Sequence, residues 1–321
     1  MDLSTLFRVD GMVAVITGGG TGIGLAFAKA LAAAGARKVY ILGRRASVLS
    51  AAAAAAAHTD VLVPVVCDVT SKASLQAAVD TIAAASGHVN LLVANAGISG
   101  PMASYGDDDD EVKGKGEGIA GLRRRLFEDV DEAAFTHTLR VNASAAFLTI
   151  GAFLALLDAG NRNAVGRRGG YGAAPDTTSS SGSGGGSASG RFPHVQSQVV
   201  VTASIAAYSR ESASPPAYVA SKAAVVQLAQ QAATNLAPYQ IRVNTLAPGW
   251  FMSEMAEPIL NARDSEAEGP GHPDFVPARR WGTEEELAGT ILYLASRAGA
   301  YCNGTIFTFD GGRLAVMPST Y

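Results

Sequence analysis

The sequence predicts an α/β fold in which one doubly wound parallel sheet of seven strands carries helices on both faces. Short apolar runs rich in Val, Ile and Leu, typical of buried parallel strands, alternate with segments of helical periodicity. A glycine-rich turn separates the first run from the first long helical segment. This alternation implies right-handed crossovers and places ligand binding beyond the carboxyl ends of the strands.

The elements follow one another without a gap large enough for a second core. The predicted strands cover residues 13–16, 39–42, 61–66, 91–94, 199–202, 242–246 and 305–309. Helices are predicted between them, and the alanine run at 51–57 is good helix-forming sequence. We therefore expect residues 1–321 to form a single domain.

Composition excludes several classes of protein. The 321 residues are 48% hydrophobic and 17% charged, and the formal net charge of −3 provides no positive field for nucleic acid. Two cysteines do not make a disulfide framework. The N-terminal sequence lacks the regions of a signal peptide, and no apolar run approaches membrane-spanning length. We therefore expect a cytoplasmic protein without nucleic-acid or membrane partners.

Two stretches interrupt the alternation. The first, 104–128, holds an acidic run at 107–111 and three arginines at 123–125, and the second, 159–197, is dominated by Gly, Ser, Ala and Arg. Both are predicted to be loops, and the second to be flexible, because it cannot bury enough apolar surface to order itself. The first follows a strand and the second a helix, so they belong at opposite edges of the sheet. Four consecutive aspartates cannot all face one ion, so we expect no metal.

The glycine-rich turn reads Thr-Gly-Gly-Gly-Thr-Gly-Ile-Gly over residues 17–24. Gly18 and Gly22 would permit a tight turn and close backbone approach, and Gly24 would let the helix pack near the strand. The free N–H groups at the helix start would then face a pyrophosphate. Strand, turn and helix together indicate a dinucleotide site. The residues of the turn assigned to that site are Gly18, Thr21, Gly22, Ile23 and Gly24.

Tyr218 and Lys222 form a second candidate feature. Four residues apart, they lie on one face of a predicted helix. A phenol has a reference pKa of about 10, and a nearby ammonium favours the phenolate and moves the pKa toward the working range. The pair therefore suggests a proton donor and acceptor for catalysis.

With these motifs in place, the chain resembles the short-chain dehydrogenase/reductase family, which implies a Rossmann-type sheet and an oxidoreductase. The order and spacing of the family's motifs match over nearly the whole chain apart from the two insertions. The motifs are Thr-Gly-x-x-x-Gly-x-Gly at 17–24, Asn-Ala-Gly at 95–97, Tyr-x-x-x-Lys at 218–222, Pro-Gly at 248–249 and Asp-Gly-Gly at 310–312.

The resemblance implies roles for three polar residues around a hydride transfer. Tyr218 would be the general acid for reduction and the general base for oxidation. Lys222 would lower the pKa of that tyrosine and bind the nicotinamide ribose. Asn142 would hold a water molecule that relays protons to Lys222.

Ser204, at the end of a predicted strand, would hold the substrate oxygen, and this hydrogen bond strengthens as charge builds on the oxygen. The spacing from Ser204 to Tyr218 is one residue longer than in many relatives, which leaves Ser209 and Ser214 as weaker candidates for the same role.

The end of the second predicted strand indicates the cofactor. Relatives that prefer NAD usually carry an Asp there, whereas this chain has Gly43 followed by Arg44 and Arg45. A carboxylate would repel a 2′-phosphate and a guanidinium would pair with it, so NADP(H) is expected. Further cofactor contacts implied by the resemblance are Asp68 and Val69 near the adenine, Asn95, Ala96 and Gly97 near its ribose, and Pro248, Gly249 and Ser253 after the sixth strand.

The segment after Pro-Gly resembles the mobile lid of the family, and here it is rich in aromatic and sulfur side chains. This composition favours an apolar or aromatic small-molecule substrate. The alternative is that some of these side chains only pack the lid onto the domain. The residues concerned are Trp250, Phe251, Met252, Met255 and Trp281.

The expected function is NADP(H)-dependent hydride transfer to or from a carbonyl or secondary alcohol. A 3-oxoacyl thioester reductase is the alternative reaction. A non-redox enzyme of the same fold (a cyclase or dehydratase) and a catalytically silent binding subunit are alternatives of other classes. The predicted helix 131–157 resembles one that pairs subunits in this family, so a homodimer or homotetramer is expected.

Overall fold

The computed structural model describes residues 3–102, 105, 118–166, 171–172 and 194–320. At its centre is one parallel sheet of seven strands in the order β3-β2-β1-β4-β5-β6-β7. The predicted fold class is confirmed, and each predicted strand agrees with an observed one to within two residues. The strands are β1 (Val13–Thr17), β2 (Lys38–Gly43), β3 (Leu62–Val66), β4 (Leu91–Ala94), β5 (Gln198–Thr202), β6 (Arg242–Pro248) and β7 (Ile306–Phe309).

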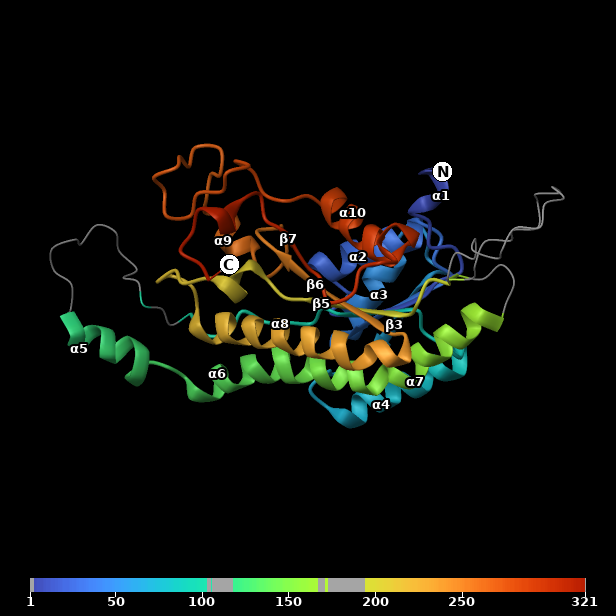
Figure 1. Cartoon of the computed structure of the whole chain (residues 1–321). Coiled ribbons are helices and arrows are strands. Elements are labelled where there is room, and N and C mark those ends of the chain that lie inside the picture. Colours follow the sequence, from blue (N-terminus) through green and yellow to red (C-terminus); the bar gives the residue numbers. More distant parts are fainter. Residues whose placement is uncertain (1–2, 103–104, 106–117, 167–170, 173–193, 321) are drawn as a thin grey trace.

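Helices cover both faces of the sheet (Figure 1). Side chains of β1 alternate between the two cores because a strand has a period of two. Ala14 and Ile16 pack toward α2, α3 and α10, whereas Val13 and Val15 pack toward α4, α7 and α8. The helices are α1 (Leu3–Leu6), α2 (Gly22–Ala33), α3 (Ala46–Ala54), α4 (Lys72–Ser86), α5 (Gly118–Arg123), α6 (Glu132–Leu139), α7 (Ala145–Gly166), α8 (Pro216–Leu236), α9 (Glu257–Leu260) and α10 (Glu284–Ala295).

The strand order reverses between β1 and β4. The chain builds outward from β1 to β3, returns to β4, and then builds outward again to β7. A crevice forms where neighbouring connections leave in opposite directions, and this is the usual place for a ligand in an open α/β sheet. The glycine-rich turn after β1 and the loop after β4 therefore meet at one edge.

A single long helix joins α6, the π turn η3 (Arg140–Ser144) and α7. The prediction ended this helix near residue 157, but it continues to Gly166, so the first residues of the second insertion are helical and not a loop. Asn161 explains the extension. Its buried side chain donates to the carbonyls of Tyr239 and Gln240 (3.3 and 2.9 Å) and accepts from the Ser197 N–H (2.7 Å).

This helix also corrects the expectation about membrane-spanning segments. The stretch Glu132–Ala164 is long and apolar enough to cross a membrane by length and composition, and half of its most apolar window is buried inside the structure. Phe153 and Leu157 are completely buried in the core that α7 shares with α4 and α8. Its apolar character is that of a core helix.

The end of the first insertion is helical, contrary to the expected loop. Residues 118–128 form α5 and the π turn η2 (Arg124–Glu128). Arg123 lies over the ring of Phe127 at 5.0 Å and pairs with Glu128, which are contacts that helical spacing creates. The acidic run at 107–111 lies outside the described residues.

Described residues of the second insertion are anchored at the amino edge of the sheet. The Tyr171 hydroxyl donates to the carbonyl of Ala295, and the N–H of Val195 donates to the Gly172 carbonyl at 2.8 Å. By contrast, Tyr105 of the first insertion donates its N–H to the Ser212 carbonyl (2.8 Å), in the loop that precedes α8 at the carboxyl edge. The remainder of both insertions lies outside the described residues.

Candidate active site

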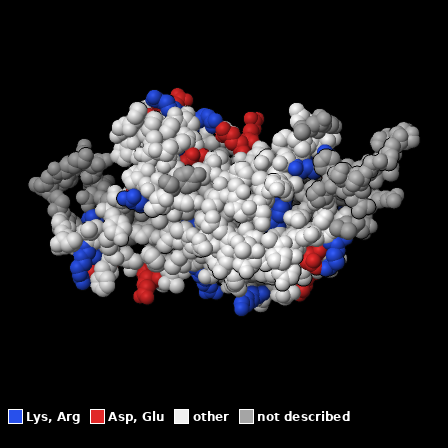
Figure 2. Space-filling model, in the orientation of Figure 1, with Lys and Arg blue, Asp and Glu red and all other residues white. Residues whose placement is uncertain are grey.

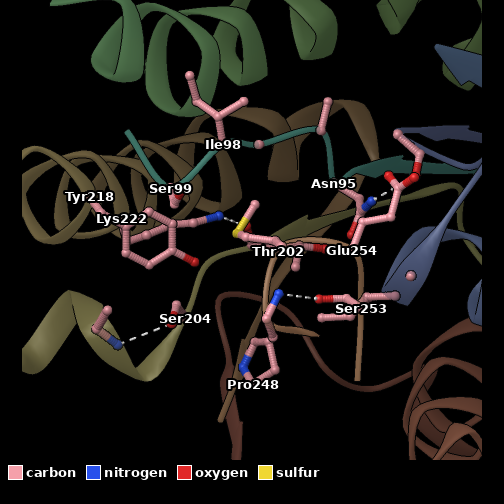
Figure 3. A pocket seen from close by; sticks show the side chains of 18 of the residues that line it. Asn95, Ile98, Ser99, Thr202, Ser204, Tyr218, Lys222, Pro248, Ser253 and Glu254 are labelled. Carbon is pink, nitrogen blue, oxygen red and sulfur yellow. Dashed lines mark hydrogen bonds between the residues drawn. The ribbon is translucent and has the colours of Figure 1, made fainter. Parts of the chain in front are cut away.

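A cavity of about 960 Å³ opens at the carboxyl edge of the sheet. All but two of the sequence-predicted site residues line it; the exceptions, Gly24 and Asn142, lie behind its wall. Figure 3 shows the catalytic candidates Ser204, Tyr218 and Lys222 on one side of the pocket and Asn95, Ser253 and Glu254 on the other. The predicted residues in the lining are Gly18, Thr21, Gly22, Ile23, Arg44, Arg45, Asp68, Val69, Asn95, Ala96, Gly97, Ser204, Tyr218, Lys222, Pro248, Gly249 and Ser253.

The glycine-rich turn requires glycine for two separate reasons. Gly18 and Gly22 have φ angles of +66° and +51°, which L side chains rarely adopt. At Gly24 the reason is space, because a Cβ would lie 2.3 Å from the Gly18 carbonyl oxygen. The turn leaves a backbone-lined cradle at the start of α2, and this cradle fits the pyrophosphate of a dinucleotide.

Thr17 and Asn95 brace this turn against the loop after β4. The Thr17 hydroxyl accepts from the N–H groups of Asn95 and Ala96 (3.0 and 3.1 Å) and donates to the Val93 carbonyl (3.4 Å). The Asn95 amide donates back to the Thr17 carbonyl at 3.0 Å. Sequence reasoning did not assign Thr17 a role. It placed Asn95 near the adenine ribose; the residue lines the cavity, and its side chain also holds the turn.

Tyr218 and Lys222 lie together in the first half of α8, as their spacing predicts. The Lys222 ammonium sits over the Tyr218 ring, 5.5 Å from the centroid, and donates to the Thr202 carbonyl at 2.9 Å. Only 4% of Lys222 is exposed. The end of β5 therefore fixes the lysine, and the lysine in turn lies against the tyrosine.

Burial controls the protonation of both groups. It lowers the pKa of Lys222 to about 8. It also raises the pKa of the Tyr218 phenol, while a hydrogen bond with Ser204 acts in the opposite direction. The direction for Tyr218 is opposite to the one expected from a neighbouring ammonium, because desolvation is the larger effect.

Ser204 caps the short 3₁₀ helix η4 (Ile205–Tyr208) that follows β5, accepting from the Ala206 N–H at 3.1 Å. The Ser204 side chain acts to lower the pKa of the Tyr218 phenol, as a neighbouring hydrogen-bonding group does. The alternative serines, Ser209 and Ser214, line the cavity but bond to each other at 2.8 Å.

Asn142 lies in the π turn η3 and connects the loop after β4 to helix α8. Its amide donates to the Ile98 carbonyl and the Ser221 hydroxyl, both at 2.9 Å, and accepts from the Ile98 N–H at 2.8 Å. A Cβ at Gly97 would lie 3.2 Å from the Asn142 Oδ1 and 3.5 Å from the Lys222 Nζ. Both polar atoms therefore face the space that this glycine leaves open.

The two arginines after β2 differ in their surroundings. Arg44 is exposed and makes no hydrogen bond or ion pair within the described part of the chain. Arg45 pairs with Glu254 of the lid, Nη2 to Oε2, at 2.7 Å. Asp68 accepts from the Thr70 N–H and hydroxyl (2.9 and 2.7 Å), and these bonds lower the pKa of the Asp68 carboxyl.

The lid supplies much of the apolar wall at the far end of the cavity. Trp250, Phe251 and Met255 line the pocket, in agreement with the expected aromatic and sulfur-rich surface. Met252 is not part of the lining and is 51% exposed. Trp281 is also outside the lining; its ring instead lies 4.8 Å from the guanidinium carbon of Arg263.

Charged residues complete this far end, and sequence reasoning missed all of them. Arg313, only 3% exposed, pairs with Glu211 and with Asp274 (3.9 Å), while Arg263 pairs with Glu268 at 2.7 Å. These ion pairs join the loop before α8, the lid and the C-terminal segment. No short motif marks the partners of Arg313, because Glu211 and Asp274 lie far from it in the sequence.

Two family profiles match the chain. The short chain dehydrogenase profile covers residues 12–167, and the enoyl-(acyl carrier protein) reductase profile covers residues 188–313. The short-chain dehydrogenase/reductase SAT3 of Stachybotrys chartarum is 50% identical over 91% of this chain and 99% of its own length. The short-chain dehydrogenase/reductase VdtF of Byssochlamys spectabilis is 42% identical over 99% and 97%.

Solved structures agree with these matches. The RhlG/NADP active-site complex of Pseudomonas aeruginosa has a TM-score of 0.71 at 27% identity, covering 97% of this chain and 99% of that one. A 7α-hydroxysteroid dehydrogenase complexed with NADH and 7-oxo glycochenodeoxycholic acid has a TM-score of 0.72 at 25% identity, covering 98% of both. From its motifs, sheet order and relatives, this chain belongs to the short-chain dehydrogenase/reductase family.

Proposed function

We propose that this protein is an NADP(H)-dependent oxidoreductase that transfers a hydride between the nicotinamide and a carbonyl or secondary alcohol of an apolar or aromatic small molecule. One observation carries the proposal: Ser204, Tyr218 and Lys222 converge in the same cavity as the glycine turn at the start of α2. A proton donor, an oxygen-binding hydroxyl and a dinucleotide cradle are what reversible carbonyl reduction requires of the protein.

The protein's part in the reaction follows from these contacts. When bound, the nicotinamide supplies or accepts the hydride. Tyr218 donates its proton to the carbonyl oxygen in reduction, and the Ser204 hydroxyl hydrogen-bonds the same oxygen as negative charge develops on it. The Lys222 ammonium over the tyrosine ring stabilises the phenolate left behind. We assign Asn142 the task of holding a relay water at Oδ1.

We infer the preference for NADP(H) from the residues that directly follow strand β2. No acidic residue follows β2 directly, and the guanidinium of Arg44 is exposed and makes no hydrogen bond or ion pair among the residues described, although it interacts electrostatically with Asp68. It is therefore available to a 2′-phosphate. The NADP complex of RhlG supports this assignment, whereas the hydroxysteroid dehydrogenase binds NADH, so cofactor choice varies among structures of this fold.

A 3-oxoacyl thioester reductase is the second candidate. A relative with 29% identity over 307 residues is the rhamnolipid-biosynthesis 3-oxoacyl-[acyl-carrier-protein] reductase of Pseudomonas aeruginosa. The ion pairs beside the lid of the present chain favour a compact substrate over a long acyl chain, because an alkyl chain there would lie against buried charges.

The test is an assay in which the oxidation of NADPH is monitored by its absorbance. The compounds offered as substrates are aromatic ketones, alicyclic diketones and 3-oxoacyl thioesters. Turnover of ketones with NADPH is the expected result, with NADH slower. Conversion of a substrate without NADPH oxidation would replace this proposal with a non-redox enzyme. Failure of every compound to react, despite cofactor binding, would favour a silent binding subunit.

We also propose that the protein acts in the cytoplasm as a homodimer or homotetramer. On α7, part of the helix expected to pair subunits, Phe147 is 58% exposed. Light scattering coupled to size exclusion is the measurement, and a monomer at micromolar concentration would contradict the proposal.

A further inference from the structure

The lid residue Glu254 bridges the mouth of the cofactor groove. Its carboxylate accepts from both terminal nitrogens of Arg45 (3.2 and 2.7 Å) and from the Thr21 hydroxyl at 3.1 Å. Arg45 follows β2, Thr21 precedes α2, and Glu254 follows β6, so three distant segments meet at one carboxylate. All three residues line the cavity.

The bridge occupies donors expected to serve the cofactor. Thr21 is the N-cap of α2, yet its side chain makes no capping bond to the helix and instead binds Glu254. Next to it, Ser253 packs so closely on Gly22 that a Cβ there would lie 3.0 Å from the Ser253 Cβ. The carboxylate thus takes a position beside the start of a 12-residue helix, where negative charge is favoured.

A phosphate and this carboxylate cannot accept from the same donors at once. A 2′-phosphate, or the two linked phosphates of the pyrophosphate together, carries more charge and more acceptor oxygens than a carboxylate, and arginine binds phosphate in the same two-pronged way. The side chains of Arg45 and Glu254 are 59% and 56% exposed. An ion pair this exposed is weak, so a phosphate can displace it.

We propose that Glu254 is an internal competitor of the dinucleotide phosphates: it holds Arg45 and Thr21 while the lid is latched, and the entering phosphate takes both donors and releases the lid. This inference rests on the proposed cofactor. It separates the two arginines, since Arg44 makes no hydrogen bond or ion pair among the described residues, whereas Arg45 must first exchange its partner.

The experiment is a titration of tryptophan fluorescence with NADPH and, separately, with NADH. Glu254→Gln removes the charge and keeps the shape, and it is expected to lower the Kd for NADPH by about threefold to fivefold, which is the upper part of the range of an exposed ion pair. Glu257→Gln is the matched control. This exposed residue of the same lid has no ion pair among the described residues, and its Kd should stay within about twofold of wild type.

A double-mutant cycle separates the latch from the general field of a negative charge. In an Arg45→Ala background, Glu254→Gln should no longer tighten binding. Tightening toward both dinucleotides would place the competition at the pyrophosphate, and tightening toward NADPH alone at the 2′-phosphate; both support the latch.

An unchanged or raised Kd in Glu254→Gln, with normal NADPH binding by the wild type, would overturn the latch alone and show that Glu254 holds Arg45 ready for the cofactor. If the wild type binds neither dinucleotide, the proposed cofactor itself is overturned.

Discussion

The two ends of the cavity are built differently. At the cofactor end, the wall consists largely of strand-end turns, and glycines such as Gly18 and Gly22 bring the backbone to the surface. At the substrate end, side chains from the lid and the C-terminal segment form the wall, and ion pairs such as Arg313 with Glu211 connect them. The sheet holds the first end directly, whereas the second depends on long-range contacts between loops.

The difference shows where the enzyme can vary. The turns after β1, β2 and β4 at the cofactor end each follow a largely buried strand of the sheet, so their geometry tolerates little change. The substrate end can be altered by substituting a lid or tail residue without disturbing the sheet. Figure 2 shows few charges over the middle of the visible face, whereas the lid region at the top carries both signs. If the two ends act separately, a change at one end leaves the properties of the other end unaltered.

Tyr218→Phe should have the largest effect, because it removes the proton donor where the two ends meet. We expect kcat to fall by roughly 10²–10⁴. The Kd for NADPH, measured by fluorescence, should stay within about twofold of wild type, since the ring and its packing remain. Substantial turnover in this variant would remove Tyr218 from the catalytic role.

Arg44→Ala should affect the cofactor end alone. The lost partner is the 2′-phosphate, and charged hydrogen bonds of this kind contribute roughly 1.5–3 kcal/mol, or about tenfold or more in affinity. NADPH binding should weaken by that factor while NADH binding and the KM of the carbonyl substrate stay unchanged. Equal losses for both dinucleotides would mean that Arg44 does not read the phosphate.

The rate should fall at alkaline pH through Lys222. Its pKa is lowered to about 8 by burial, whereas burial raises the pKa of Tyr218, so the lysine titrates first. We expect kcat/KM for reduction to decline by about tenfold per pH unit above pH 8. The free energy of unfolding should instead rise over the range from pH 8 to about 10.4, the pKa of lysine in the unfolded chain. In that range the unfolded chain binds more protons than the folded one. A flat rate profile up to pH 10 contradicts this role.

Shortening the second insertion should have the smallest effect. Residues 161–191 have the composition of a flexible loop, which would allow their removal. However, Asn161 is buried and hydrogen-bonded to three backbone groups. Removing 173–193 instead leaves Asn161, and the hydrogen bond between Gly172 and Val195 holds the cut ends close.

For the deletion of residues 173–193 we expect unchanged kcat and KM and a change in the free energy of unfolding within about 1 kcal/mol. The longer cut should cost about 1–3 kcal/mol or more through the orphaned backbone groups. Denaturant unfolding of both variants is the measurement, and a loss of activity in the shorter one would mean that the insertion acts at the opposite edge.

The sequence predicted the sheet and the cofactor end well because both depend on local patterns. Buried parallel strands are continuous apolar runs, and the glycines of the turn follow β1 directly. The helix at 118–128 was missed because the acidic run beside it dominates the composition of that stretch. Glu254, Arg313 and Glu211 were missed because only the fold brings them to their partners.

The central claim is that a hydride passes between NADPH and a carbonyl carbon while Tyr218 supplies the proton. The most direct measurement uses NADPH carrying deuterium at the transferable position, with a ketone from the panel, followed by mass spectrometry and NMR of the product. We expect one deuterium on the carbinol carbon for the wild type and almost no product for Tyr218→Phe. A product without deuterium, or equal labelled product from both proteins, would contradict it.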